Sequence, residues 1–322
     1  MVTQEAIRRN IYDTPPLREG EEFGGITRKG NVVVIDQFAK DQSDLSNLSA
    51  IRRKEAEIMR LPLEERKPAF TSLSPILANF SENEATFRAL EQLYTEDEVR
   101  FNGLKDVDDA GVAKSWFECF SNARAVRERK TATTRLLLES IKTASFQSPQ
   151  RPIDLTSIAS GSARCVVETL QQKLKTIDVQ ARMLDWDPEA REYSKKLAKD
   201  AGVADQIEII PGDVIRIRKH LSSKPIDVAE AVGIIDYFDE RTTIFFLSQI
   251  YSLLRQDGVL VASNIMPNRE SNFIHTAVGW RPMHYRTEDT FLDLLSKSGF
   301  DASNCRIHKI PSGIYCIIEA KK

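Results

Sequence analysis

One stretch, residues 151–187, constrains the fold of this chain most, because it has the pattern of a strand, a tight turn, a helix and a second strand. The first apolar run ends at Ile158 and is followed by five small residues, ASGSA, at positions 159–163. Small side chains let backbone N–H groups come close to a ligand. The second apolar run ends at Asp185, and an acid at that place typically accepts hydrogen bonds from the hydroxyl groups of a ribose. The stretch therefore predicts a βαβ unit that can hold a nucleotide-like ligand.

The chain after residue 187 continues to alternate strand and helix patterns. β-Prone runs at 206–210, 226–232 and 259–265 are separated by helical stretches. Two further β-prone runs, at 305–310 and 314–320, flank a turn at 311–313, which predicts a hairpin. Together with the strands of the first unit, this order predicts an α/β fold. We expect a Rossmann-like, seven-stranded, mostly parallel sheet with a C-terminal antiparallel β-hairpin, spanning residues 150–322.

The patterns in residues 1–149 are mainly helical, with breaks at Pro62, Pro68 and Pro75. One β-prone run at 31–38 could pair with another strand or pack as an extended segment. Because this region precedes the sheet, we expect it to form a helical cap, or lid. Such a cap would cover the carboxyl ends of the strands and exclude water.

Aromatic and basic residues are joined in the segment at 116–129. One interpretation is an apolar turn followed by a solvated basic helix face. The other is a lid segment whose aromatic residues face a ligand, with an arginine on the ligand's carboxylate. Under this second interpretation the substrate or lid residues are Phe117, Phe120, Asn122 and Arg127.

The overall charge and the cysteine pattern argue against several classes of protein. The net charge is −2, from 45 basic and 47 acidic residues, so there is no electrostatic case for a nucleic-acid partner or an anionic membrane. The four cysteines are scattered and form no C-x-x-C pair, which indicates buried thiols rather than disulfides or a metal site. No apolar run approaches the roughly 18 residues that span a bilayer, and no signal core is present at the start, so a cytoplasmic location is the expectation.

Three of the predicted strands end in residues suited to a nucleoside, at the edge where open α/β sheets bind ligands. There Asp185 would bind the ribose, Asp213 would accept from an adenine amino group, and the turn at 160–163 would face the tail of the ligand. Asp213 could equally be a solvated loop residue. A dinucleotide site needs more glycines than Gly161 alone, and a P-loop needs a lysine that is absent here. A nucleoside ligand without phosphates therefore fits this turn better.

These motifs together resemble those of class I S-adenosylmethionine-dependent methyltransferases, over residues 151–322. SIASGSA at 157–163 stands in the place of the family's acid-h-G-x-G-x-G loop, where h is apolar. LDWDP at 184–188 matches the ribose-binding motif, and PGDV at 211–214 matches the adenine-side motif. The final hairpin matches the last two strands of the family fold.

Further segments are similar to a bacterial subgroup of this family, which includes enzymes that make 3-hydroxypalmitic acid methyl ester. These segments are AVRER at 125–129, AVGIIDYF at 231–238, ASN at 262–264, and the stretch from Trp280 to Thr287.

The resemblance implies S-adenosylmethionine as the cofactor, methyl transfer as the reaction and a small molecule as the acceptor. The residues it assigns to the cofactor are Ala159, Ser160, Gly161, Asp185, Trp186, Gly212, Asp213, Val214, Gly233 and Asp236. Aromatic faces steady a sulfonium cation by about 0.5–2 kcal/mol, and tyrosine or histidine can serve as a general base. The candidate catalytic residues are Tyr237, Trp280 and His284, although a single histidine is more often a surface or packing residue. We expect no metal, and a homodimer is left open.

One departure from the family pattern concerns the cofactor's methionine portion. The family has an acid where this chain has Ser157, and glycines where it has Ala159 and Ala163. In the family that acid helps to hold the amino group of the cofactor. With Ser157 in its place the amino group either has another partner, for which Asp236 and backbone carbonyls are candidates, or is held less tightly.

Two alternatives to methyl transfer remain. In the first, the protein transfers or cyclises the aminocarboxypropyl part of S-adenosylmethionine, for example to azetidine-2-carboxylate, and releases methylthioadenosine. In the second, the fold is a non-catalytic binding subunit, which only the substituted glycine loop supports. The sequence does not name the acceptor or its nucleophilic atom.

Overall fold

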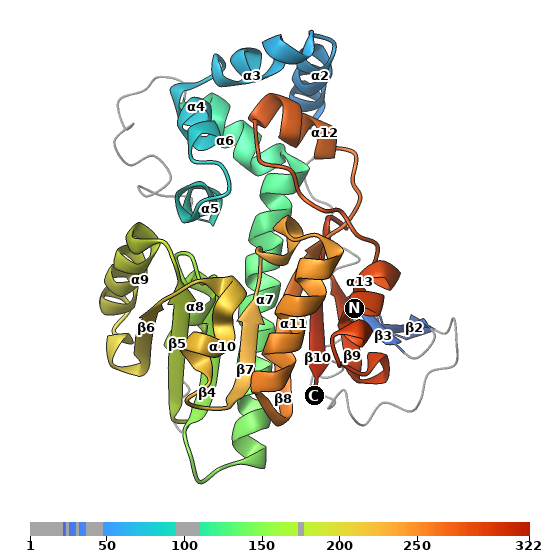
Figure 1. Cartoon of the computed structure of the whole chain (residues 1–322). Coiled ribbons are helices and arrows are strands. Elements are labelled where there is room, and N and C mark those ends of the chain that lie inside the picture. The colour runs from blue at the N-terminus through green and yellow to red at the C-terminus, as the bar shows by residue number, and fades with distance from the viewer. Residues whose placement is uncertain (1–21, 24–25, 30–31, 37–47, 95–109, 173–176) are drawn as a thin grey trace.

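The computed structural model describes residues 22–23, 26–29, 32–36, 48–94, 110–172 and 177–322. Within them a ten-stranded sheet runs in the order β1-β2-β3-β9-β10-β8-β7-β4-β5-β6 (Figure 1). The strands are β1 Glu22–Phe23, β2 Ile26–Lys29, β3 Val32–Asp36, β4 Ile153–Ile158, β5 Val179–Asp185, β6 Ile207–Pro211, β7 Ile226–Ala231, β8 Leu254–Ile265, β9 Cys305–Lys309 and β10 Tyr315–Lys321.

Seven of these strands, β4 to β10, form the predicted Rossmann-like sheet. β4 pairs in parallel with β5 and β7, β5 pairs with β6, and β7 pairs with β8. β10 lies antiparallel between β8 and β9, which is the predicted C-terminal hairpin. The strand order therefore confirms the fold class. It also reverses direction at β4, with β5 on one side and β7 on the other, and such switch points are where open α/β sheets bind ligands.

Three N-terminal strands extend the sheet beyond the predicted seven. The β-prone run at 31–38 contains β3, which pairs in parallel with β9, with Val34 opposite Ile307. β2 and β1 continue from β3 in antiparallel pairs. A hairpin strand at the rim of a sheet presents unpaired N–H and C=O groups, and β3 satisfies those of β9. Strand periodicity indicates that a strand exists but does not name its partner.

Helices cover both faces of the sheet and form the predicted cap. They are α2 Leu48–Met59, α3 Leu63–Thr71, α4 Pro75–Glu82, α5 Phe87–Tyr94, α6 Ala110–Cys119, α7 Ser121–Gln147, α8 Arg164–Gln171, α9 Pro188–Asp200, α10 Ile217–Leu221, α11 Glu240–Leu253, α12 Ser271–Phe273 and α13 Glu288–Lys297. Side chains of α7, α8 and α9 share one apolar cluster with the sheet and the cap, whereas those of α10, α11 and α13 share a second cluster on the other face. In the described part of the chain, no helix is apolar over a length that would cross a membrane.

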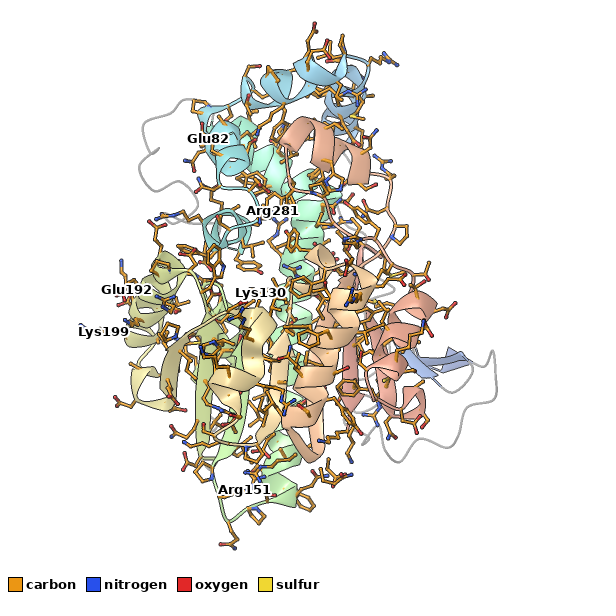
Figure 2. All side chains as sticks on the ribbon, in the orientation of Figure 1. Glu82, Lys130, Arg151, Glu192, Lys199 and Arg281 are labelled. Carbon is orange, nitrogen blue, oxygen red and sulfur yellow. The ribbon has the colours of Figure 1, made fainter. Side chains whose placement is uncertain are left out.

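The long helix α7 belongs to both the cap and the sheet. It has 27 residues, about 40 Å at 1.5 Å per residue, and it runs from the cap down one face of the sheet (Figure 1). It contacts α5 and α6 in the cap and β4, β7, β8 and β10 in the sheet. Lys130 on this helix, which is labelled in Figure 2, also pairs with the side chain of Glu168 on α8. Its Nζ lies 2.7 Å from each carboxylate oxygen. The predicted domain boundary at 149–150 falls in the loop between α7 and β4.

The connection between β8 and α13 packs against the cap along much of its length, and two of its polar contacts involve Arg281 and Glu270. Arg281 lies where this connection approaches α5, and its backbone N–H donates to the Glu84 carboxylate at 2.7 Å (Figure 2). The second residue is Glu270, whose side chain is fully buried. Both contacts hold the cap over the carboxyl ends of the strands.

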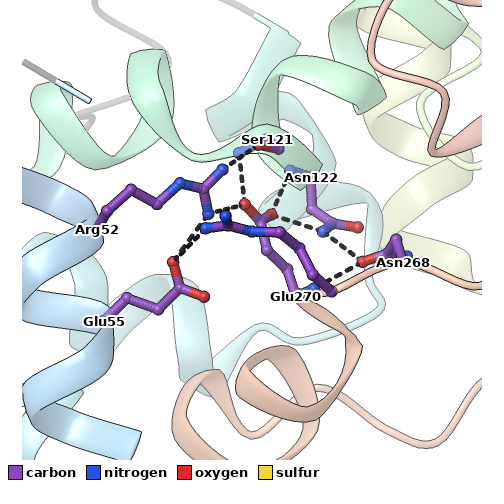
Figure 3. Close-up of polar contacts among 7 residues, drawn as sticks. Arg52, Glu55, Ser121, Asn122, Asn268 and Glu270 are labelled. Atoms are coloured by element: carbon purple, nitrogen blue, oxygen red, sulfur yellow. Dashed lines mark hydrogen bonds and ion pairs between the residues drawn. The ribbon is translucent and has the colours of Figure 1, made fainter. Parts of the chain in front are cut away.

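Glu270 joins three segments that are far apart in the sequence (Figure 3). Its carboxylate accepts hydrogen bonds from the backbone N–H groups of Ser121 at 3.2 Å and Asn122 at 2.9 Å, and it pairs with Arg52 of α2. The first N–H groups of a helix have no partner within the helix, and Phe120, at the N-cap of α7, offers no side-chain cap. Glu270 therefore caps α7 from a distant loop, with a charge that suits a helix N-terminus.

We expect Glu270→Ala to lower the free energy of unfolding by about 3–5 kcal/mol, because it removes the fully buried carboxylate that caps α7 and leaves the partly buried Arg52 with only Glu55 as an ionic partner among the described residues. Urea unfolding followed by circular dichroism measures this. The matched control is Glu57→Ala. Glu57 also forms an ion pair with a residue of α2, but its partner, Lys54, is half-exposed. It should change stability by less than about 0.5 kcal/mol. An equal effect of the two substitutions would contradict the capping role.

Candidate active site

The loop after β4 has an uncommon backbone conformation. Ala159, Gly161 and Ala163 have positive φ angles of 59°, 54° and 56°. A left-handed conformation costs a residue with a Cβ roughly 1–2 kcal/mol, and branched side chains tolerate it worst. This explains why small residues occupy this loop. The Gly161 N–H donates to Asp185 Oδ2 at 2.7 Å, so the loop lies against the end of β5, as the predicted βαβ unit requires.

Asp185 is the last residue of β5 and is buried. Its two carboxylate oxygens accept from the backbone N–H groups of Gly161 and, at 2.9 Å, of Asp187. Burial raises the pKa of Asp185, and these two hydrogen bonds oppose that rise. A carboxylate has about four lone-pair sites, so two bonds leave acceptor capacity for a diol. The neighbouring Trp186 is 75% exposed.

The turn after β6 accepts only glycine at position 212. A Cβ on Gly212 would lie 2.7 Å from Leu184 Cδ1 and 2.8 Å from the His220 ring, closer than real Cβ contacts. The next residue, Asp213, uses Oδ1 to accept the Ile215 N–H at 2.8 Å, which is a local cap. Its side chain is 56% exposed. Its second oxygen, Oδ2, lies 3.9 Å from Arg216 Nε in an exposed ion pair, so Asp213 combines a structural role with an oxygen that a ligand can reach.

A cavity of about 90 Å³ lies between the cap and the turn after β7. Aromatic and aliphatic side chains form most of its wall, mainly from α3 to α7 and from the connection that follows β8. At its sheet end it meets Gly233, Asp236 and Tyr237. The apolar wall therefore ends in a polar floor at the carboxyl end of β7.

The floor of the cavity holds two groups with shifted pKa values. Burial raises the pKa of Asp236 to about 6, and its Oδ1 accepts the Ile265 N–H at 2.8 Å. Burial also raises the pKa of Tyr237 above its usual range. The Trp280 indole N–H donates to the Tyr237 hydroxyl at 2.9 Å. At neutral pH Asp236 is therefore ionised, whereas Tyr237 is a protonated phenol.

The structure brings most of the predicted substrate and catalytic residues together. Those that line the cavity are Phe117, Phe120, Asn122, Tyr237 and Trp280. Gly233 and Asp236, assigned to the cofactor, line it as well. The remaining cofactor candidates lie at the ends of β4, β5 and β6. The Asn122 amide already donates to Glu270 at 2.7 Å, so this side chain also takes part in capping α7.

Arg127 and His284 do not line the cavity. Arg127 Nη1 donates to the Phe117 carbonyl at 2.6 Å and ties α6 to α7. His284 is exposed, and its backbone N–H donates to the Asp236 carbonyl at 2.7 Å.

Two buried charged residues at this site were not among the predicted ones. Arg129 of α7 lines the cavity and is 3% exposed. Glu230 of β7 is buried, and it accepts from Ser157 Oγ and from the Val232 N–H at 3.1 Å. The signal for Arg129 is its helical spacing from Asn122 and Val126, on the apolar stripe of α7. The signal for Glu230 is an acid inside a short apolar strand.

A family model described as "Putative methyltransferase" matches residues 111–322, about two thirds of the chain. The chain belongs to this family. It is therefore an enzyme of the S-adenosylmethionine-dependent methyltransferase class. The match begins within α6, so it includes α7, whose N-terminal half lines the cavity of this methyltransferase.

Two of the solved structures that resemble this methyltransferase differ in how closely they match it. A "possible exported protein" from Bordetella parapertussis is 18% identical, with 87% of this chain and 97% of that chain aligned at a TM-score of 0.64. An O-methyltransferase family 2 protein from Planctomyces limnophilus, in complex with apigenin, is 15% identical, with 89% and 99% aligned at a TM-score of 0.46. At these identities the first likeness shows the fold alone. No curated protein matches the sequence significantly.

The raised pKa values predict how stability depends on pH. Burial raises the pKa of Glu230 from 4.5 to about 7 and that of Asp236 from 3.8 to about 6. The folded state then binds more protons than the unfolded state, so stability falls as pH rises between about 4 and 7. We expect Glu230→Gln to reduce this slope by up to about 1.4 kcal/mol per pH unit.

Urea unfolding of both proteins at pH 5, 6, 7 and 8 measures the slope. Glu192→Gln is the control, because this glutamate side chain is 72% exposed, and it should leave the slope unchanged. If the free energy of unfolding changes with pH to the same extent in the wild type and in Glu230→Gln, the pKa of Glu230 is not raised by burial.

Proposed function

We propose that this protein transfers the methyl group of S-adenosylmethionine to an apolar small-molecule acceptor held in the cavity between the cap and β7. The observation that carries the proposal is the position of the cavity. Its apolar wall opens onto Asp236 and Tyr237, beside the strand ends that carry the small-residue loop and Asp185. A family match over two thirds of the chain supports methyl transfer, and neither alternative reaction gains support.

The residues at the strand ends fit the cofactor. The loop after β4 exposes backbone close to the carboxylate of Asp185, which retains lone pairs for the ribose hydroxyls. Gly212 keeps the turn after β6 in contact with Leu184, and the second oxygen of Asp213 is available to an adenine amino group. When bound, S-adenosylmethionine supplies an electrophilic methyl group on a sulfonium.

The protein's own contribution is mainly alignment and the exclusion of water. Correct placement of two reactants can supply about 7–11 kcal/mol of the barrier, and helices of the cap form much of the cavity wall. Asp236 is the residue best suited to receive a proton from a hydroxyl acceptor, because it lines the cavity and its pKa of about 6 is near neutral. Tyr237 and Trp280 would contribute an aromatic surface near the sulfonium.

The size of the cavity bears on the acceptor. Its volume of about 90 Å³ is below the roughly 150 Å³ that holds a benzene molecule. An acceptor that is larger than this cavity requires the cap to move away from the sheet. A 3-hydroxy fatty acid, as in the bacterial subgroup noted above, suits the apolar wall, and its carboxylate would need no general base. A compact aromatic acceptor suits the same wall with less movement.

Asp185→Asn tests the cofactor site. We expect its affinity for S-adenosylhomocysteine to fall about 10- to 100-fold, because a charged acceptor of ribose hydrogen bonds is lost. Isothermal titration calorimetry measures the affinity. Asp205→Asn is the control, because Asp205 is exposed on the turn before β6. This variant should bind S-adenosylhomocysteine as the wild type does. A wild-type protein with no affinity for this ligand, or an Asp185→Asn variant with full affinity, would overturn the assignment.

Val126→Phe tests the acceptor cavity, because Val126 lines it and a larger side chain fills it. We expect this variant to bind S-adenosylhomocysteine within about twofold of the wild type. It should lose the S-adenosylhomocysteine formation that the wild type shows with aromatic or fatty acids and alcohols. Val112→Phe, at a more exposed position on α6, is the matched control. Unchanged turnover in Val126→Phe would place the acceptor elsewhere.

A further inference from the structure

Glu230 brings a carboxylate to the place where Ser157 departs from the family pattern. The two residues are directly opposite in the parallel pairing of β4 and β7, and the Ser157 hydroxyl donates to Glu230 Oε2. In the family the acid stands on β4 itself. Here the side chain from β4 is a hydroxyl, and the neighbouring strand supplies the acid that contacts it.

Glu230 is a buried acid without a cationic partner. Its hydrogen bonds come from two neutral donors, Ser157 and the Val232 N–H. Among the described residues it forms no ion pair, although Arg129 lies near enough to favour its ionised form. Burying a carboxylate without a cation is costly. A ligand ammonium group would complement it.

Arg129 is the corresponding buried cation. Its guanidinium lies against Gly233, where a Cβ would be 3.2 Å from both terminal nitrogens, and over the Tyr315 ring at 4.6 Å. Nε has no hydrogen-bond partner in the part of the chain that the structure describes. Tyr94 is a neutral partner, and within the described ranges no carboxylate forms an ion pair with Arg129. An anionic group of a ligand would complement it.

We propose that Glu230 and Arg129 together bind the amino-acid end of the cofactor, with Glu230 accepting hydrogen bonds from the α-ammonium group and Arg129 donating to the α-carboxylate. This inference rests on the proposed function. It follows from two opposite, buried and unpaired charges on β7 and α7, at the switch point of the sheet. An amino acid carries the same two charges on one carbon. Asp236 is then left to the acceptor side of the site.

Two ligands separate this inference from the proposed function. S-Adenosylhomocysteine carries the amino-acid end, whereas 5′-methylthioadenosine has the same nucleoside and lacks it. We expect Glu230→Gln and Arg129→Met each to weaken binding of S-adenosylhomocysteine at least about tenfold. Both should bind methylthioadenosine within about twofold of the wild type in calorimetry.

Returning the acid to β4 provides a rescue. The double variant Ser157→Asp with Glu230→Gln restores a carboxylate at the family position and should recover most of the lost affinity for S-adenosylhomocysteine. Asp236→Asn is the matched control, because Asp236 is the other buried acid near Arg129. This variant should lose affinity for both ligands equally or for neither. If Asp236→Asn is the only variant that loses affinity for S-adenosylhomocysteine but not for methylthioadenosine, Asp236 holds the amino group and the inference is wrong.

A measurement on the wild type needs no substitution. Groups near Glu230 are Ser157 on β4, Arg129 on α7 and the Cys165 thiol on α8, whose pKa burial raises to about 12. Of these only Glu230 titrates near neutral pH, at a pKa of about 7. A bound ammonium lowers that pKa, so affinity for S-adenosylhomocysteine should rise about tenfold from pH 6 to pH 8, with proton release. Methylthioadenosine should show no such rise.

The outcomes are distinguishable. A wild type that binds neither ligand contradicts the proposed function. A wild type that binds both, with the same pH dependence for each and no selective loss in Glu230→Gln, contradicts only the role of Glu230 and Arg129.

Discussion

The site depends on a single helix that is shared by the cap and the sheet. α7 packs along one face of the sheet and continues into the cap, and Glu270 holds its first turn. Since Glu270 also pairs with Arg52 of α2, the same carboxylate sets where the cap lies. The cavity wall therefore includes residues of a helix whose other end is fixed in the core. A displacement of the helix terminus would move Asn122, Val126 and Arg129 together.

Three buried charged residues lie close to one another where the cap meets the sheet. Glu230, Asp236 and Arg129 all lie within the low-dielectric interior, where an unpaired ion is costly. Other buried acids in the described chain form ion pairs, such as Glu91 with Arg164 and Asp227 with Arg151. At the site, Arg129 lies near Glu230 and Asp236, but among the described residues it forms no ion pair with either. Such an arrangement lowers stability and favours a ligand that carries complementary charges.

Several features of the site could be predicted from the sequence because they are local. The small-residue loop follows from backbone requirements within a few residues, and Asp185 follows from its place at the end of an apolar run. One of the two interpretations of the segment at 116–129 has its aromatic residues facing a ligand, and Phe117 and Phe120 do line the cavity. Other assignments depended on helix phase: Arg127 and Arg129 are two positions apart, about 200° around a helix, and only Arg129 faces the cavity. The exposed position of His284 had no local signal either.

The sequence by itself determined the order of strands and helices, the turn chemistry and the acid at the end of β5, because periodicity and small-residue turns depend on near neighbours in the chain. Only the tertiary structure decided which distant groups meet. The pairing of β3 with β9, the capping of α7 by Glu270 across 148 residues and the contact between Ser157 and Glu230 all join segments that no local pattern relates. Their partners are set by the register of the sheet and by the packing of α7, which are properties of the whole fold.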